Sequence, residues 1–128
     1  MIIWGGTTNA GTHALNTGAR FNPMLGTWTG ISTTNAPAGR FYRSAVWTGD
    51  EMIIWGGYNG STVVNTGARY DPATDTWNAL PTPSAPAVRD LHTGVWTGRE
   101  MLIWGGWNGS SFLNTGGRYN LASNSWAA

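Results

Sequence analysis

The chain has 128 residues, no cysteine and a formal net charge of +1, and all seven of its cationic residues are arginines scattered along the sequence. The lack of cysteine excludes a disulfide framework and a thiolate nucleophile or metal ligand, and scattered arginines do not make the basic surface that nucleic-acid binding requires. Abundant glycine and tryptophan with few charged residues indicate a folded, turn-rich β protein.

The first predicted element is a short apolar strand that ends in two glycines, and this sequence motif occurs three times. Each copy of Met-(Ile/Leu)-Ile-Trp-Gly-Gly is followed by Asn-Thr-Gly-(Ala/Gly)-Arg and then by a lone tryptophan. The second and third sets lie 49 positions apart, and a fixed period of this size predicts a repeat architecture. The copies begin at Met1, Met52 and Met101; at Asn16, Asn65 and Asn114; and at Trp28, Trp77 and Trp126.

The middle repeat predicts four short antiparallel strands. Gly49-Asp50 is a two-residue hairpin signal, and Asp71-Pro72 begins a turn. The run 52–55 is apolar on both faces, which is typical of a central strand covered on both sides. Sheets of this size cannot bury a core alone, so neighbouring repeats must stack face to face. The predicted strands are 40–48, 51–55, 62–70 and 76–80.

The order of features in each repeat resembles the kelch repeat: an apolar strand, Gly-Gly, an aromatic residue and then a tryptophan. The exact sequence of the motif is similar to that of bacterial kelch proteins. The resemblance covers nearly the whole chain, and its one departure is Phe21 where the other repeats have tyrosine. It implies an all-β fold, a kelch-type β-propeller, whose rings usually have about six or seven blades. The residues that carry it are Gly5, Gly6, Phe21 and Trp28; Gly56, Gly57, Tyr70 and Trp77; and Gly105, Gly106, Tyr119 and Trp126.

Three repeats make about half of such a ring. We expect one unit, 1–128, with repeats at 1–33, 40–80 and 89–128, the first of which lacks its innermost strand. In the family, that strand is often supplied by the C-terminus, and none is predicted after Trp126. An open arc would expose apolar blade faces, so we expect a homodimer in which two copies join head to tail into a six-bladed ring. The alternative is a fragment of a longer parent, or a design.

The aromatic residues divide into two groups. Those that recur in strands are expected to pack between blades, whereas Tyr58 and Trp107 follow Gly-Gly in loops, beside Asn59 and Asn108. Aromatic rings beside Asn and Ser suit a sugar-binding surface, although rings folded over the neighbouring blade are the favoured alternative. Asn-Gly-Ser at both places also matches a glycosylation sequon, but turn chemistry explains it better. The candidate ligand-binding residues are Tyr58, Asn59, Trp107, Asn108, Arg40, Arg89 and His92.

The charged and titratable residues give little sign of catalysis. Arginines that recur with the fold, such as Arg40 and Arg89, are expected to make structural hydrogen bonds to carbonyls or glutamates, or to bind an anion or carbohydrate if they line the channel. His92 aligns with Arg43, and His13 lies in a longer first loop. Without a second ligand at a fixed spacing, no metal and no cofactor are predicted. No apolar run is long enough to span a membrane, and no signal peptide is recognisable, so localisation stays open.

We therefore expect a non-catalytic binding or scaffold module with a protein or carbohydrate ligand. A sugar-active propeller enzyme, of hydrolase or mutarotase type, is one alternative and would need a unique acid–base pair. A purely structural propeller without a ligand is the other. Antiparallel strand direction places the binding segments on one face, opposite the Gly49-Asp50 type of turn. These segments are the loops 7–15, 58–64 and 107–113 and the linkers 31–39 and 81–88.

Overall fold

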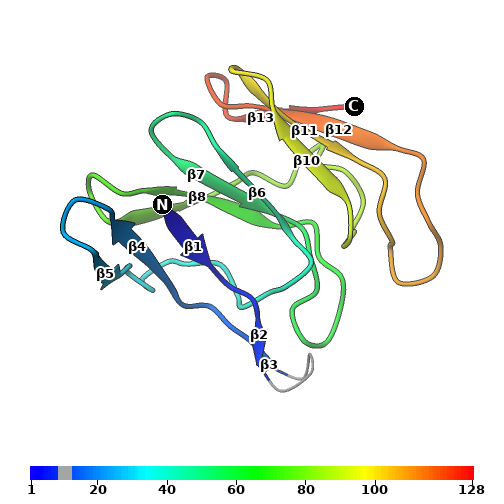
Figure 1. The fold of residues 1–128 in the computed structure, drawn as a ribbon. Helices are drawn as coiled ribbons and strands as arrows, with labels where there is room; N and C mark the ends of the chain where they lie inside the picture. Colours follow the sequence, from blue (N-terminus) through cyan, green and yellow to red (C-terminus); the bar gives the residue numbers. More distant parts are fainter. Residues whose placement is uncertain (9–12) are drawn as a thin grey trace.

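The computed structural model describes residues 1–8 and 13–128, and this part of the chain consists of β-strands, turns and loops. Three main antiparallel sheets follow one another as blades 1, 2 and 3, fanned out with blade 2 between the others (Figure 1). Blade 1 is β1 (Ile2–Trp4), β4 (Gly18–Asn22) and β5 (Thr27–Gly30). Blade 2 is β6 (Ser44–Trp47), β7 (Met52–Trp55), β8 (Gly67–Asp71) and β9 (Thr76–Ala79). Blade 3 is β10 (Thr93–Trp96), β11 (Glu100–Trp104), β12 (Gly116–Asn120) and β13 (Ser125–Ala127).

The predicted all-β propeller arc is confirmed, with three corrections to its elements. The first strand of blade 2 was predicted from residue 40 but starts at Ser44. The first loop holds an additional two-stranded hairpin, β2 (Thr7–Thr8) with β3 (His13–Ala14), which the sequence did not predict. The third strand of blade 2 was predicted from residue 62 but starts at Gly67. The loop before it closes on itself instead, because the Val64 amide donates to the Gly57 carbonyl at 2.9 Å.

β7 is the central strand of the arc, and all four of its residues are buried. Ile53 and Trp55 pack in a cluster with blade 3, whereas Met52 and Ile54 pack in a second cluster with blade 1. Because side chains of a strand point alternately to its two faces, an apolar run of this kind requires a neighbour on each side. The prediction of a central strand covered on both sides is therefore confirmed.

Tryptophans join each blade to the next. The ring of Trp4 in blade 1 lies 5.4 Å from that of Trp77 in blade 2, between centroids, and Trp55 lies 5.2 Å from Trp126 in blade 3. Packing between blades, predicted for these residues, is thus confirmed for both pairs. The rule does not extend to the ends of the arc, where Trp28 and Trp104 are exposed because no further blade of the described chain covers them.

Polar contacts reinforce the seam between blades 1 and 2. Arg20 donates through Nη1 to the carbonyl of Pro72 at 2.7 Å, and the indole of Trp77 donates to the carbonyl of Ser32 at 2.9 Å. The carboxylate of Asp75 accepts from the Ser32 amide at 2.9 Å and from the Tyr70 hydroxyl at 2.6 Å. Burial, followed by the bond to this carboxylate, raises the pKa of Tyr70 to about 12.

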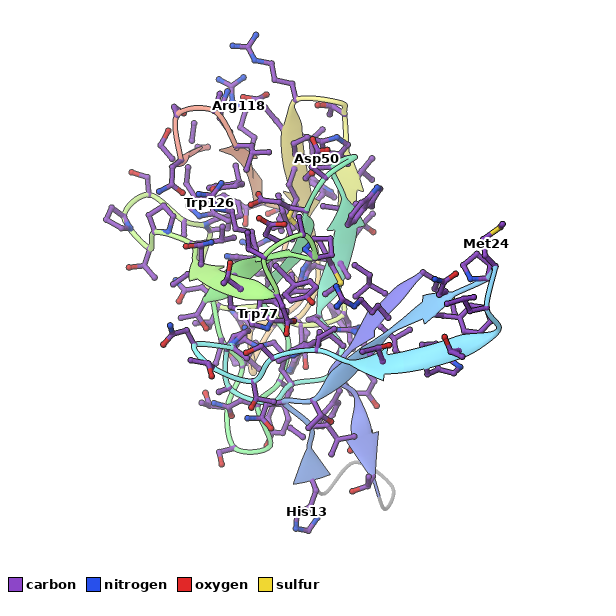
Figure 2. The ribbon with its side chains drawn as sticks, turned by 90° about the vertical axis from the view of Figure 1, so that its left-hand side faces the viewer. His13, Met24, Asp50, Trp77, Arg118 and Trp126 are labelled. Atoms are coloured by element: carbon purple, nitrogen blue, oxygen red, sulfur yellow. The ribbon has the colours of Figure 1, made fainter. Side chains whose placement is uncertain are left out.

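The short turns within the blades and the long loops lie on opposite faces of the arc. Figure 2 shows Asp50, in the short turn between β6 and β7, at the end opposite His13 in the first loop. No helix in the described part of the chain has the length and apolarity needed to cross a bilayer.

Candidate ligand-binding face

The loops after Gly-Gly and the linkers between blades lie together on one face, as predicted. The amide of Gly57 donates to the carbonyl of Arg89 at 2.9 Å, and the Arg89 amide donates to the carbonyl of Val64 at 3.3 Å. The same bonds join Gly6, Arg40 and Leu15 one blade earlier. We call this surface the loop face: loops 58–64 and 107–113, linkers 31–39 and 81–88, and residues 41–42 and 90–91. The loop 7–15 was also assigned to it, but residues 9–12 lie outside the described residues.

The second glycine of each Gly-Gly pair permits this close approach. Gly57 has a φ of +95°, and a Cβ on it would come within 2.6 Å of the Phe41 carbonyl. Gly106 repeats the situation, with a φ of +93° and the Asp90 carbonyl 2.4 Å from the built Cβ. Any side chain there would push the first strand of the blade away from the loop. The motif thus fixes how loop and linker meet.

Arg40 and Arg89 hold the linkers in place. Each is 1 % exposed. The Arg89 guanidinium donates to the carbonyls of Ala87 and Gly105 at 3.0 Å each and of Thr115 at 2.6 Å. Arg40 makes the equivalent three bonds one blade earlier. Burial, and then the charge of Arg43, lowers the pKa of Arg40 to about 10. The predicted structural bonds to carbonyls are confirmed, and we leave both arginines out of the proposed ligand surface.

Arg43 and His92 occupy equivalent places and each reaches back to the preceding blade. Arg43 donates to the carbonyl of Trp4. His92 lies edge-on to Trp55, with 5.2 Å between ring centroids, and its Nε2 is 2.9 Å from the Ser44 hydroxyl. Burial, and then the charge of Arg89, lowers the pKa of His92 to about 4. His92 is therefore a neutral seam residue at neutral pH rather than an exposed candidate ligand.

The loop residues indicated by the sequence are partly buried against neighbouring residues of the loop face. Tyr58 packs on Phe41 and Trp107 on Phe112, with ring centroids 5.4 and 4.9 Å apart. The side-chain oxygen of Asn59 accepts two amides of its own turn, from Ser61 at 2.9 Å and Thr62 at 2.8 Å. Asn108 makes the matching pair of bonds. The prediction that these asparagines serve turn chemistry is confirmed.

Two exposed apolar residues of the loop face were missed by sequence reasoning. Tyr42 and Leu91 are equivalent in blades 2 and 3, are 55 % and 59 % exposed, and have φ angles of +56° and +52°. The Leu91 amide donates to the Tyr42 carbonyl at 3.0 Å, so the two lie side by side. A bulky residue with positive φ is a genuine outlier, and such strain concentrates at functional sites. No glycine or asparagine marks the position, so the sequence holds no signal for it.

The other non-glycine residues with positive φ in the described part of the chain provide the contrast. They are Asn35 with Ser84 and Asp75 with Asn124, which are also equivalent pairs. These polar residues are common in turns and tolerate the left-handed conformation. Among the residues that the structure describes, large apolar side chains take it at Tyr42 and Leu91 alone, which makes this pair the most distinctive feature of the loop face. Exposed Phe112 adds further apolar surface to the face.

Comparison with known families agrees with this architecture. The family described as the KLHDC2/KLHL20/DRC7 Kelch-repeats domain matches residues 1–128, the full length of the chain. No match was found among curated proteins.

Proposed function

The chain belongs to the kelch-repeat family, and we propose that it is a non-catalytic binding module whose ring is closed by two copies joined head to tail. A propeller-type binding or scaffold role follows from the family in general. The closure and the ligand surface are the specific parts of the proposal. Each is supported by a separate set of exposed residues.

The closure rests on two exposed apolar surfaces at opposite ends of the arc. The blade 1 open face consists of Met1, Ile3 and Trp28, and the blade 3 open face consists of Val95, Leu102 and Trp104. Trp28 is 50 % exposed and Trp104 is 62 % exposed. Large contiguous apolar surfaces of this kind mark association sites.

The two open faces carry the two halves of one interface. Trp104 is the repeat equivalent of Trp4 and Trp55, which each lie against a tryptophan of the following blade. Trp28 is the equivalent of the receiving residues, Trp77 and Trp126. Trp28 also rests on Phe21 at 5.1 Å, as Trp77 rests on Tyr70 at 5.0 Å. Trp104 of one copy against Trp28 of a second would therefore repeat a seam that the chain already makes twice. This complementarity is the observation that carries the proposal.

The remaining positions of the two faces fit the same register. Leu102 and Val95 stand where Ile53 and Val46 pack against blade 3, and Met1 and Ile3 stand where blade 3 presents Met101 and Ile103. Because the two surfaces differ, the contact is heterologous and would form a closed ring once two copies supply six blades. Two such seams hold the proposed ring together.

The seam between blades 1 and 2 suggests a polar contact for the closure, whereas at the seam between blades 2 and 3 the equivalent Arg69 bonds to Glu51 of its own blade. Arg118 is the repeat equivalent of Arg20, which donates to the Pro72 carbonyl of the next blade. Its own side chain is largely exposed, with a 3.9 Å contact to Glu100. Pro23, on the blade 1 side, is the equivalent of Pro72. Arg118 of one copy is thereby placed to donate to the Pro23 carbonyl of the other.

For the ligand surface, we propose the apolar part of the loop face. Tyr42, Leu91 and Phe112 are its exposed large side chains, and partly buried Tyr58 and Trp107 support them. Aromatic anchors beside polar turns are typical of protein-binding surfaces, since they bury much area at low entropic cost. A protein segment with apolar side chains is the favoured ligand, with a carbohydrate as the alternative left from the sequence.

Light scattering tests the closure. The wild-type chain is expected to have twice the mass of one 13.7 kDa chain. Replacing Trp104 with aspartate should give the monomer mass, whereas the same change at exposed Met24, in the turn before β5, should leave the dimer intact. A stable monomeric wild type would refute the proposed ring.

Peptide and glycan arrays test the ligand surface. Tyr42→Ala with Leu91→Ala should weaken binding to any ligand found, with no fall in melting temperature, because both side chains are exposed. Tyr58→Ala with Trp107→Ala gives the companion measurement on the residues that the sequence indicated. Array binding that survives all four replacements would place the ligand elsewhere.

A further inference from the structure

We infer that the ligand of the loop face presents an arginine side chain, whose guanidinium pairs with the carboxylate of Asp90 beside Trp107. This site would form part of the ligand surface proposed above and depends on that proposal. Asp90 marks a break in the repeat, because its equivalent in blade 2 is Phe41. Residues that recur serve the shared fold, so a charged residue in the place of an apolar one needs an explanation of its own.

Asp90 stands at one end of a row of three side chains. Its backbone forms an antiparallel bridge with Trp107, and Trp107 forms a second bridge with Phe112. The backbones of Asp90 and Trp107 exchange two hydrogen bonds of 2.9 Å, so their side chains are neighbours on one side of the ladder. The rings of Trp107 and Phe112 are in contact, with 4.9 Å between centroids. We call Asp90, Trp107 and Phe112 the acidic row.

The equivalent row in blade 2 carries no charge. Phe41, Tyr58 and Val63 take the three places and are joined by the same two bridges. The rings of Phe41 and Tyr58 lie 5.4 Å apart, between centroids, and both Phe41 and Val63 are buried. The carboxylate of Asp90 thus occupies a position that the fold can fill with an apolar ring. The local backbone therefore does not require an acid there.

The carboxylate of Asp90 is buried without a partner. The residue is 6 % exposed, and its Oδ1 is shielded from solvent and accepts no hydrogen bond from the described residues. Neither of the two salt bridges in the described part of the chain involves Asp90, and the guanidinium of adjacent Arg89 is committed to three carbonyls. Burial raises the pKa of Asp90. Burying an unpaired carboxylate costs free energy, which a cation from outside the chain would offset.

A guanidinium suits the acidic row better than an ammonium does. It donates two parallel hydrogen bonds to a carboxylate, and it stacks on an aromatic face, which Trp107 provides beside Asp90. An ammonium is more strongly hydrated and meets a carboxylate at a single point, so it would lose more on entering a buried site. The ligand would then be a protein segment in which arginine accompanies apolar side chains, and the latter would contact exposed Tyr42, Leu91 and Phe112.

NMR titration of the isotope-labelled wild-type chain tests the pairing, with Nα-acetyl-arginine amide as the probe. The resonances of the Asp90 amide and the Trp107 indole should shift and saturate in the millimolar range. The Leu91 amide should shift with them, because little of Asp90 is exposed and its exposed neighbour must move as the guanidinium enters. Nα-acetyl-citrulline amide has nearly the same shape without the charge and should cause no saturable shift. Nα-acetyl-lysine amide should bind severalfold more weakly than the arginine probe.

A matched pair of aspartate variants makes the test specific. Asp90→Asn keeps the shape of the side chain and should weaken binding of the arginine probe about tenfold or more, because it removes the charge. Its melting temperature should not fall, since the variant removes a buried charge that has no partner in the chain. Asp50→Asn, in the short turn on the opposite face, should bind the probe as the wild type does.

The probe and the array experiments fail separately. Arrays that yield only ligands without arginine would leave the apolar surface in place and overturn the arginine site. A probe that binds through Asp90 would still mark a cation site even if Tyr42→Ala with Leu91→Ala changed no array binding. No saturable shift with the arginine probe, equal binding of the citrulline or lysine probe, or full binding by Asp90→Asn would overturn the pairing of arginine with Asp90.

Discussion

The ring of Trp55 lies against that of Trp126 in the next blade, with 5.2 Å between centroids, and Trp104 presents the same side chain at the end of the arc. Trp55 is fully buried, and the ring of His92 also lies against it. The difference between the two tryptophans is therefore one of neighbours, since the local sequence around them is nearly identical. Burial in a repeat protein depends on the adjacent repeat.

A tryptophan at a seam should contribute more to stability than an exposed one. Trp55→Ala should lower the free energy of unfolding by about 3 to 5 kcal/mol, because it empties a buried seam. Trp47→Ala, at an exposed site, should cost about 1 kcal/mol or less. Urea denaturation of the two variants checks this, and equal losses would contradict the seam assignment.

The linker arginine Arg89 should be indispensable for stability. Arg89→Leu removes the buried guanidinium that donates to three carbonyls, so we expect a loss of about 3 kcal/mol. Arg89→Lys should rescue little, because a single ammonium cannot reproduce the planar fork. Arg99→Leu, on an exposed turn, is the control and should be near neutral in the same thermal melts. A neutral Arg89→Leu would refute the proposed clamp.

Stability should fall between pH 6.5 and pH 4 because of His92. The folded chain keeps this residue neutral down to a pKa of about 4, whereas the unfolded chain protonates it near 6.5. The unfolded state then binds more protons in this window, so the free energy of unfolding drops as the pH falls, by about 2 to 3 kcal/mol.

His92→Gln removes this titration and can keep a hydrogen bond to Ser44. Its stability curve should be flatter than that of the wild type over the same window, because every other group of the chain is the same in both proteins. Denaturation series at several pH values give the comparison. Parallel curves would show that His92 does not carry the effect.

The close approach of Ser44 and Gly94 gives a coupled pair. Gly94→Ala should destabilise the chain by about 1 to 3 kcal/mol, because its Cβ would overlap that of Ser44. Ser44→Gly should reduce the cost of Gly94→Ala in a double-mutant cycle. Additive losses would mean that the two side chains do not meet.

Most strands, the seams between blades and the grouping of loops and linkers on one face could be predicted from the sequence. Each repeated residue marks a place where the backbone or the packing permits few other residues. Gly57 and Gly106 mark the places where the linker meets the loop, and the run 52–55 marks a strand covered twice. The hairpin of β2 and β3 could not be foreseen, since two-residue strands carry no periodicity. The conformation of Tyr42 and Leu91 is set by the surrounding backbone, and neither residue type favours it.

The sequence indicated which loops and linkers share one face of the arc, but not which side chains that face exposes. Arg40 and Arg89 were included because they recur, yet recurrence cannot tell a ligand contact from a bond to a carbonyl. His92 was included because it breaks the repeat, but its ring fills a seam between blades. Exposure of a side chain depends on contacts between blades, and one repeat taken by itself does not contain them.

A mixing experiment tests the head-to-tail ring most directly. Trp104→Asp leaves only the blade 1 open face functional, and Trp28→Asp leaves only the blade 3 open face functional. In the mixture, Trp104 of one partner can still meet Trp28 of the other at one seam, whereas the two aspartates face each other at the second seam. Light scattering should therefore show each variant alone as a monomer and the equimolar mixture as a dimer held by the one intact seam, at a protein concentration well above that at which the wild type dimerises. A mixture that stays monomeric while the wild type is dimeric, or a dimer of either variant alone, would contradict the proposed closure.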